Sequence, residues 1–202
     1  MSEIYALSDD VLSPNDLILA HAHEILKNGI KYYQYRCKTE KNEQIAREIL
    51  KLCNKFNAKF IVNDDIDFAL KIGAKCVHIG KDDADLKYAR SVLGDNAFIG
   101  VSCYDDLDLA IKMQEDTADY VAFGAVYPSK TKPNTTKVSL ETIKKAKDVL
   151  SVPICVIGGI NTENIAEVAN LGVDMIAIVN AIYKPESITK NILKLKLAMN
   201  KK

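Results

Sequence analysis

Eight short apolar runs recur along the chain, separated by segments of helical character, and this alternation constrains the fold more than any other feature. Runs such as 60–62 and 175–179 are continuously apolar, which is typical of parallel strands buried on both faces. We therefore predict strands at 4–7, 32–35, 60–62, 76–79, 98–101, 120–126, 154–157 and 175–179.

The intervening segments carry the start and stop signals of helices. Ser13 precedes Pro14 as an expected N-cap, and Gly29 and Gly73 are typical stops. Eight strand-then-helix units predict an α/β fold, a single (β/α)8 TIM barrel forming one domain over 1–202. An open doubly wound sheet shares this alternation and is the alternative. Helices are predicted over 14–28, 40–57, 65–72, 83–93, 105–115, 139–150, 162–171 and 187–200.

Length and charge narrow the class of protein. The chain has 202 residues, enough for one sizeable core but short for such a barrel, so its loops must be tight. The 27 basic and 27 acidic residues give a formal net charge of zero. This balance offers no overall attraction to nucleic acid or to an anionic membrane, and we expect neither as a partner.

The sequence also predicts a cytoplasmic protein. No apolar run approaches the ~20 residues of a membrane span, and residues 1–3 lead into the first strand without the apolar region of a signal peptide. The five cysteines are odd in number and contain no CxxC pair. A disulfide framework or a structural zinc site is therefore not expected.

Basic side chains follow the second predicted strand, at the end of the barrel where this fold builds its sites. Arg36 and Lys38 alternate with Gln34, which places all three on one side of the strand. Two cations on an inward-facing row are costly unless they meet an anion. With Lys130 and Lys132 at the same end, they predict a phosphate or diphosphate site. The alternative is a solvated strand end paired with acids.

Acidic side chains follow the next two strands. Asn63, Asp64 and Asp65 end the third strand, and Asp82 and Asp83 follow the fourth. Because neighbouring strands lie ~5 Å apart, one carboxylate from each can converge on a hard cation. Mg²⁺ takes one or two carboxylates together with water and phosphate oxygens. The alternative is that Asp65 and Asp82 are helix N-caps.

The later loops add candidate phosphate ligands. Segment 127–138 is polar and rich in Lys and Thr, which suits phosphate capture by a loop. Gly159 follows the seventh strand, where such barrels commonly bind phosphate. The alternative is that glycine stands there only because the turn is tight. His78 is either a packed core residue or a base, and Ser102 either a hydrogen-bonding site residue or part of a turn.

Taken in order, these motifs resemble those of the thiamine-phosphate synthase family over nearly the whole chain. Several motifs in the right order are specific, whereas any one alone would be weak. Segment 34–38 matches a Gln-x-Arg-x-Lys motif, and 100–102 a Gly-x-Ser motif. The other matches are 5–9 to a strand ending in Thr-Asp, 63–65 to Asn-Asp-Arg, 78–83 to His-x-Gly-Gln-x-Asp, 128–132 to Pro-Thr-x-Thr-Lys and 157–160 to Ile-Gly-Gly-Ile.

The resemblance implies a transferase that joins 4-amino-5-hydroxymethyl-2-methylpyrimidine diphosphate to a (carboxy)thiazole phosphate, giving thiamine phosphate and pyrophosphate. It also implies Mg²⁺ as cofactor, held by Asp64 and Asp83. The catalytic residues it implies are Arg36, Lys38, Lys132 and Ser102. The substrate-binding residues it implies are Gln34, Tyr35, Arg36, Cys37, Lys38, Asn63, Ser102, Ser129, Lys130, Thr131, Lys132, Gly159, Val179 and Asn180.

Four positions depart from the family pattern: Asp65, Lys81, Ser129 and Asn180 stand where the family has Arg, Gln, Thr and Ser. None of these removes an expected metal ligand or a cation of the diphosphate site. The expected partners are small-molecule substrates, and a homo-oligomer is compatible with the fold. Two alternatives are a thiazole phosphate tautomerase of a related branch and a non-catalytic thiamine phosphate-binding protein.

Overall fold

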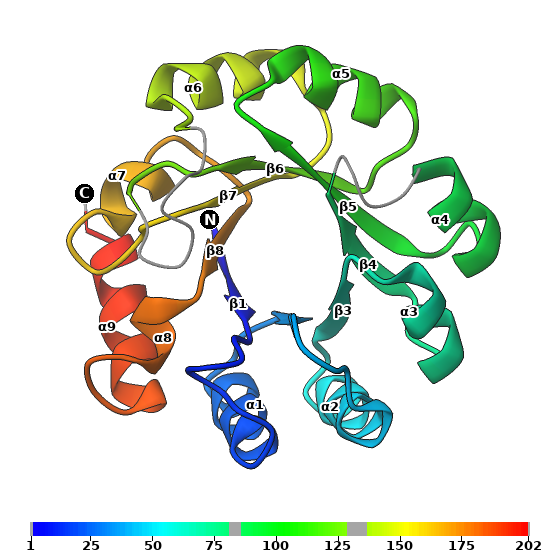
Figure 1. Ribbon diagram of the computed structural model, residues 1–202. Coiled ribbons are helices and arrows are strands. Elements are labelled where there is room, and N and C mark those ends of the chain that lie inside the picture. The colour runs from blue at the N-terminus through cyan, green and yellow to red at the C-terminus, as the bar shows by residue number, and fades with distance from the viewer. Residues whose placement is uncertain (1, 81–85, 129–136, 202) are drawn as a thin grey trace.

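The computed structural model describes residues 2–80, 86–128 and 137–201. Eight parallel strands pair in chain order and close into a barrel, because β8 pairs with β1 (Figure 1). This closure confirms the predicted (β/α)8 barrel and rules out the open sheet. The strands are β1 (Glu3–Leu7), β2 (Tyr32–Tyr35), β3 (Lys59–Asn63), β4 (Cys76–Ile79), β5 (Phe98–Tyr104), β6 (Tyr120–Gly124), β7 (Ile154–Ile157) and β8 (Met175–Ile178).

Helices surround the barrel and alternate with its strands (Figure 1). Several begin at side-chain caps: the side chains of Asp65, Ser139 and Ser187 each accept a backbone N–H three residues ahead. The helices in the described residues are α1 (Ile18–Lys27), α2 (Glu43–Lys55), α3 (Ile66–Ile72), α4 (Leu86–Leu93), α5 (Leu107–Glu115), α6 (Leu140–Val149), α7 (Ile165–Ala169), α8 (Asn180–Tyr183) and α9 (Ile188–Met199).

The predicted start of the first helix is wrong. Helix α1 begins at Ile18, and Ser13 is not its N-cap, since the Ser13 hydroxyl lies 3.0 Å from His21 Nδ1. Asp9 instead accepts the backbone N–H groups of Val11 and Leu12, both at 3.1 Å. These side-chain bonds hold residues 9–12 in a turn, a local arrangement that competes with helix. Residues 15–17 form a second turn, in which the Leu17 N–H donates to the Pro14 carbonyl at 2.9 Å.

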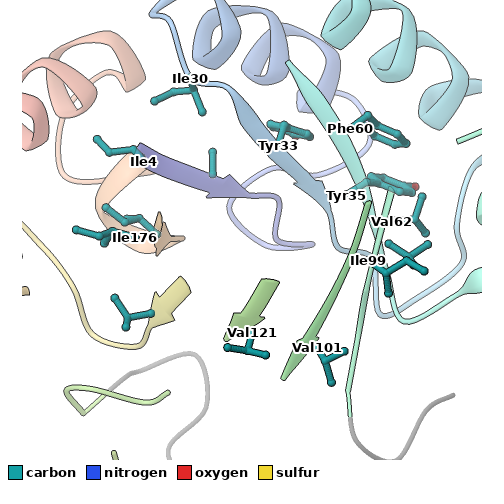
Figure 2. Close-up of a cluster of buried hydrophobic side chains, with 14 of the residues drawn as sticks. Ile4, Ile30, Tyr33, Tyr35, Phe60, Val62, Ile99, Val101, Val121 and Ile176 are labelled. Carbon is teal, nitrogen blue, oxygen red and sulfur yellow. The ribbon is translucent and has the colours of Figure 1, made fainter. Parts of the chain in front are cut away.

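Two apolar layers stabilise the barrel. The outer layer lies between the strands and the helices, and Figure 2 shows part of it, including Tyr33, Phe60 and Val62. The inner layer fills the barrel itself. Its buried members are Tyr5, Leu7, Ile61, Tyr120, Ala122, Cys155, Met175 and Ala177.

One glycine makes room for the largest of the inner side chains. Gly100 on β5 pairs with His78 on β4 and with Tyr120 on β6. A Cβ atom at Gly100 would lie 1.9 Å from Cζ of Tyr120, far inside van der Waals contact. The missing side chain therefore lets the Tyr120 ring cross β5 and stack on His78, with ring centroids 5.6 Å apart.

Within the part of the chain described above, no helix has the length and apolar character needed to cross a membrane.

Candidate active site

The loop after β2 is tied to the loop after β1. Ser8 Oγ accepts the backbone N–H of Arg36 at 2.8 Å and donates to the Arg36 carbonyl at 3.1 Å. The Arg36 guanidinium lies 3.9 Å from Asp9, and the backbone N–H of Lys38 donates to Asp10 at 3.0 Å. Strand β2 ends at Tyr35, so both cations lie beyond it rather than along its inward row. The contact between Arg36 and Asp9 agrees in part with the alternative to a phosphate site, in which the cations after the second strand pair with acids.

Two neighbours of Arg36 face different surroundings. The Tyr35 ring is fully buried in the outer layer, between Phe60 and Phe68, and its hydroxyl accepts the N–H of Asn42. Any contact between Tyr35 and a substrate would thus be through its backbone. Cys37 is half-buried, and its sulfur lies 3.4 Å from the hydroxyl of Thr39.

The acids after β3 divide into two kinds. Asp64 is exposed, and its φ of +62° is in the left-handed region, which Asp tolerates better than most residues. Its carboxylate accepts a hydrogen bond from the Asn63 amide, and its N–H donates to the His78 carbonyl at 2.9 Å. Asp65 instead caps α3 and lies 3.1 Å from Lys41. The N-cap alternative is therefore confirmed for Asp65.

Convergence of the two predicted metal ligands lies beyond what the structure describes, because Asp82 and Asp83 fall in 81–85. Among the residues that are described, no group of three or more His, Cys, Asp or Glu side chains is arranged to hold a metal. The predicted residues Ser129, Lys130, Thr131 and Lys132 also lie outside the described ranges.

The turn after β7 packs tightly against the loop after β6. Gly159 has φ of +63°, and a Cβ there would lie 2.5 Å from the Pro128 carbonyl oxygen. Asn164 donates to the Gly159 carbonyl at 3.1 Å. The turn geometry alone thus requires glycine, in addition to any role in binding an anion. After β8, Val179 is the N-cap residue of the short helix α8, which begins at Asn180.

A row of polar side chains lines the interior of the barrel beneath these loops. Gln34 is only 3% exposed, and its Nε2 donates to the Tyr5 hydroxyl at 2.8 Å. The hydroxyls of Tyr5 and Tyr120 lie 3.1 Å apart, and that of Tyr120 lies 2.9 Å from His78 Nδ1. His78 Nε2 lies 2.8 Å from Ser102 Oγ. The five side chains form one continuous hydrogen-bonded chain.

Sequence reasoning found Gln34, His78 and Ser102 but missed Tyr5 and Tyr120. Both tyrosines lie inside apolar strands, where a pattern analysis assigns them to the core. The glycine at position 100 was the available signal, because glycine inside a strand often marks a close approach by another group.

Comparisons with known proteins identify the family of the chain. The family sequence model described as thiamine monophosphate synthase matches residues 4–182. A thiamine-phosphate synthase of Thioalkalivibrio sulfidiphilus is 43% identical over 183 residues, covering 89% of this chain and 87% of that protein. One from Halorhodospira halophila is 42% identical over 165 residues, covering 80% and 79%.

A solved structure of a related protein agrees with the sequence matches. The thiamine phosphate pyrophosphorylase of Pyrococcus furiosus superposes with a TM-score of 0.87 at 29% identity, covering 98% of this chain and 95% of that one. A 3-hexulose-6-phosphate synthase superposes at 0.73 with 17% identity, which is a likeness of fold alone. The sequence relatives reported above are both named for one transferase activity, and the chain belongs to the thiamine monophosphate synthase family.

Proposed function

We propose that this protein joins 4-amino-5-hydroxymethyl-2-methylpyrimidine diphosphate to a thiazole phosphate, which carries a carboxylate or lacks it, and releases pyrophosphate. One observation carries the proposal beyond family membership. Polar side chains suited to a pyrimidine and its diphosphate gather at the carboxyl ends of four consecutive strands, β2 to β5. They are Gln34 on β2 and Arg36 just after it, Asn63 at the end of β3 and Asp64 just after it, His78 on β4 and Ser102 on β5.

The reaction we propose is a dissociative displacement. The bond between the pyrimidinylmethyl carbon and the diphosphate oxygen breaks, and its electron pair leaves with pyrophosphate. The resulting cation is trapped by the lone pair of the thiazole nitrogen. Negative charge therefore grows on the leaving group, where Arg36 offers a planar fork of donors and Lys38 a point charge. Lys132 adds a third cation in the proposal.

Asp64 is suited to hold Mg²⁺ on the diphosphate. Its carboxylate is exposed at the end of β3, and the hydrogen bond from Asn63 restricts its orientation. Carboxylate oxygens are the hard ligands that Mg²⁺ prefers, and Asp83 would supply the second one. When bound, the ion would neutralise charge on the leaving diphosphate as a Lewis acid.

The thiazole phosphate would bind on the opposite side of the barrel mouth, after β6, β7 and β8. The proposed ligands are the backbone at Gly159, Val179 and Asn180 together with Ser129, Lys130, Thr131 and Lys132. A backbone contact at Asn180 would survive the change from serine in the family pattern, whereas a contact through the hydroxyl would not.

Pyrophosphate release provides the test. Purified protein is given the pyrimidine diphosphate with or without thiazole phosphate, in Mg²⁺ or in EDTA. We expect release, with formation of thiamine phosphate, only when both substrates and Mg²⁺ are present. Isomerisation of a thiazole phosphate without Mg²⁺ would instead indicate the tautomerase. Tight binding of thiamine phosphate without any release would indicate a binding protein.

A further inference from the structure

The hydrogen bonds that link the five side chains inside the barrel have a fixed order of donors and acceptors. The Gln34 amide nitrogen can only donate, so the Tyr5 oxygen accepts from it. The Tyr5 hydroxyl has one proton, and within the described residues Tyr120 is the one remaining group to which it is bonded. Donation from Tyr120 to Tyr5 would leave that proton buried without an acceptor, which costs the full desolvation of the group. Tyr5 therefore donates to Tyr120.

The same reasoning fixes the direction of the next two hydrogen bonds, from Tyr120 to His78 and from His78 to Ser102. The Tyr120 oxygen accepts from Tyr5, so its own proton goes to His78 Nδ1 at 2.9 Å. A neutral imidazole with an accepting Nδ1 carries its hydrogen on Nε2 and donates it to Ser102 Oγ at 2.8 Å. The Ser102 hydroxyl proton is then directed away from His78.

Burial keeps the tyrosine links in one protonation state. Tyr5 is 1% exposed and Tyr120 is fully buried, and desolvation raises the pKa of both phenols. Neither phenol ionises near neutral pH, so each offers one proton and the order of donors cannot reverse by loss of one.

We propose that this chain holds His78 as the neutral Nε2–H tautomer and thereby presents the Ser102 hydroxyl as a hydrogen-bond donor to the pyrimidine substrate, with Tyr5, Tyr120 and His78 as positioning residues. His78 is thus neither a general base nor an activator of Ser102 as a nucleophile. The substrate assignment rests on the function proposed above, whereas the tautomer does not.

The polarity of the chain matches the ligand chemistry. At one end Gln34 uses its Nε2 on Tyr5, so its Oε1 is left as an acceptor, and at the other end Ser102 donates. An aminopyrimidine carries an amino donor and ring-nitrogen acceptors, so it can satisfy both ends. A pyrimidine that lacks the amino group would leave the Gln34 acceptor without its donor.

Nitrogen NMR on the intact protein tests the tautomer directly. With ¹⁵N-labelled histidine and no substrate, we expect His78 Nδ1 to give a pyridine-like signal and Nε2 a pyrrole-like one. Tyr120→Phe keeps the ring that stacks on Phe98 but removes the donor to Nδ1, so its His78 should show a mixture of tautomers. Tyr32→Phe removes a hydroxyl from the same interior but outside the chain, and its His78 should match the wild type. A wild-type Nδ1–H tautomer would overturn the proposal at any level of activity.

Kinetics test the link to substrate. Tyr120→Phe should lower kcat/KM for the pyrimidine diphosphate about ten-fold, the scale of one misdirected hydrogen bond, and leave KM for thiazole phosphate unchanged. Equal kinetics despite a shifted tautomer would refute the positioning role. Wild-type protein with the Nε2–H tautomer but no pyrophosphate release would refute the proposed function. It would not contradict the proposed order of hydrogen bonds from Gln34 to Ser102.

A matched pair at His78 covers the case in which Tyr120→Phe does not fold. Gln places an amide donor where Nε2 stands, and Asn places its polar atoms where Nδ1 stands. We expect His78→Gln to retain more activity than His78→Asn, because it keeps the donor to Ser102. The reverse order, in variants with the wild-type circular dichroism spectrum, would contradict the proposal.

Discussion

Gly100 and Tyr120 occupy what would otherwise be one space: a Cβ on the glycine would lie 1.9 Å from Cζ of the tyrosine ring. The two residues are register partners on β5 and β6, and His78 is the partner of Gly100 on β4. The glycine two positions before Ser102 therefore has a structural purpose. It allows a tyrosine two strands away from His78 to bond that histidine, which in turn bonds Ser102.

Gly100→Ala should consequently destabilise the barrel and disturb the site together. Overpacking of a dense core costs about 1–3 kcal/mol, and the ring of Tyr120 has to move away from His78 to admit the methyl group. Urea denaturation measures the loss. The control is Gly100→Ala combined with Tyr120→Leu, which should show a favourable coupling energy in a double-mutant cycle. Unchanged stability of the single variant would contradict the contact.

The acids that follow β3 should respond differently to the same substitution. Asp64→Ala is expected to lose most activity and to need more Mg²⁺ for what remains, because its carboxylate is the proposed metal ligand. Asp83→Ala should behave alike. Asp65→Ala should keep the wild-type Mg²⁺ dependence and lose about 1 kcal/mol of stability, because Asp65 caps α3. Activity measured against Mg²⁺ concentration separates these cases, and an unchanged Mg²⁺ requirement in both Asp64→Ala and Asp83→Ala would remove the metal assignment.

Arg36→Ala should slow turnover by removing charge stabilisation from the leaving diphosphate. The expected cost is roughly 2–4 kcal/mol in the barrier, by analogy with the loss of an oxyanion donor. Lys51→Ala, an exposed cation on α2, is the control and should turn over at the wild-type rate. Steady-state pyrophosphate release compares the two variants. A wild-type rate for Arg36→Ala would refute its role in holding the diphosphate.

The sequence predicted the barrel well because continuously apolar strands such as 60–62 can be recognised from the local sequence pattern alone. The start of α1 was missed because residues 15–17 form a separate turn, in which the Leu17 N–H donates to the Pro14 carbonyl, and a helix signal at Ser13 cannot distinguish that turn from the first turn of a helix. The roles of Tyr5 and Tyr120 were missed for a different reason. Their hydroxyls meet only when β1 and β6 face each other across the closed barrel, and no local pattern carries that relationship.

Among the metal and phosphate candidates, some positions could be found from the sequence motifs, whereas the role of Asp65 needed the structure. The motif order led to Asp64 and Gly159, and the structure places one at an exposed strand end and the other in a turn that only glycine fits. For Asp65 the motif position was ambiguous, because a cap and a ligand both favour aspartate. The hydrogen bond to the Phe68 N–H, which depends on where α3 begins, resolves it as a cap.

Thiol reactivity gives a last prediction that bears on both the fold and the site. Burial raises the pKa of Cys53 and Cys103 to about 12 and raises the pKa of Cys155 further. Against an ordinary thiol pKa of ~8.5, a value of about 12 lowers the thiolate fraction at pH 8 roughly 10³-fold. Cys37, which Arg36 and Lys38 flank, and Cys76 are both half-buried, but burial raises the pKa of Cys76, so a disulfide reagent should titrate Cys37 first in the native protein.

The same thiol reports on the diphosphate site. Pyrophosphate with Mg²⁺ should slow the reaction of Cys37, because the anion would bind to the two flanking cations. Cys37→Ser should abolish the fast phase, and unfolding in guanidinium should expose all five thiols. A fast phase that persists in Cys37→Ser would refute its assignment to Cys37 and point to Cys76, the other half-buried cysteine. A fast phase that belongs to Cys37 but is insensitive to Mg²⁺ and pyrophosphate would move the diphosphate away from Arg36 and Lys38.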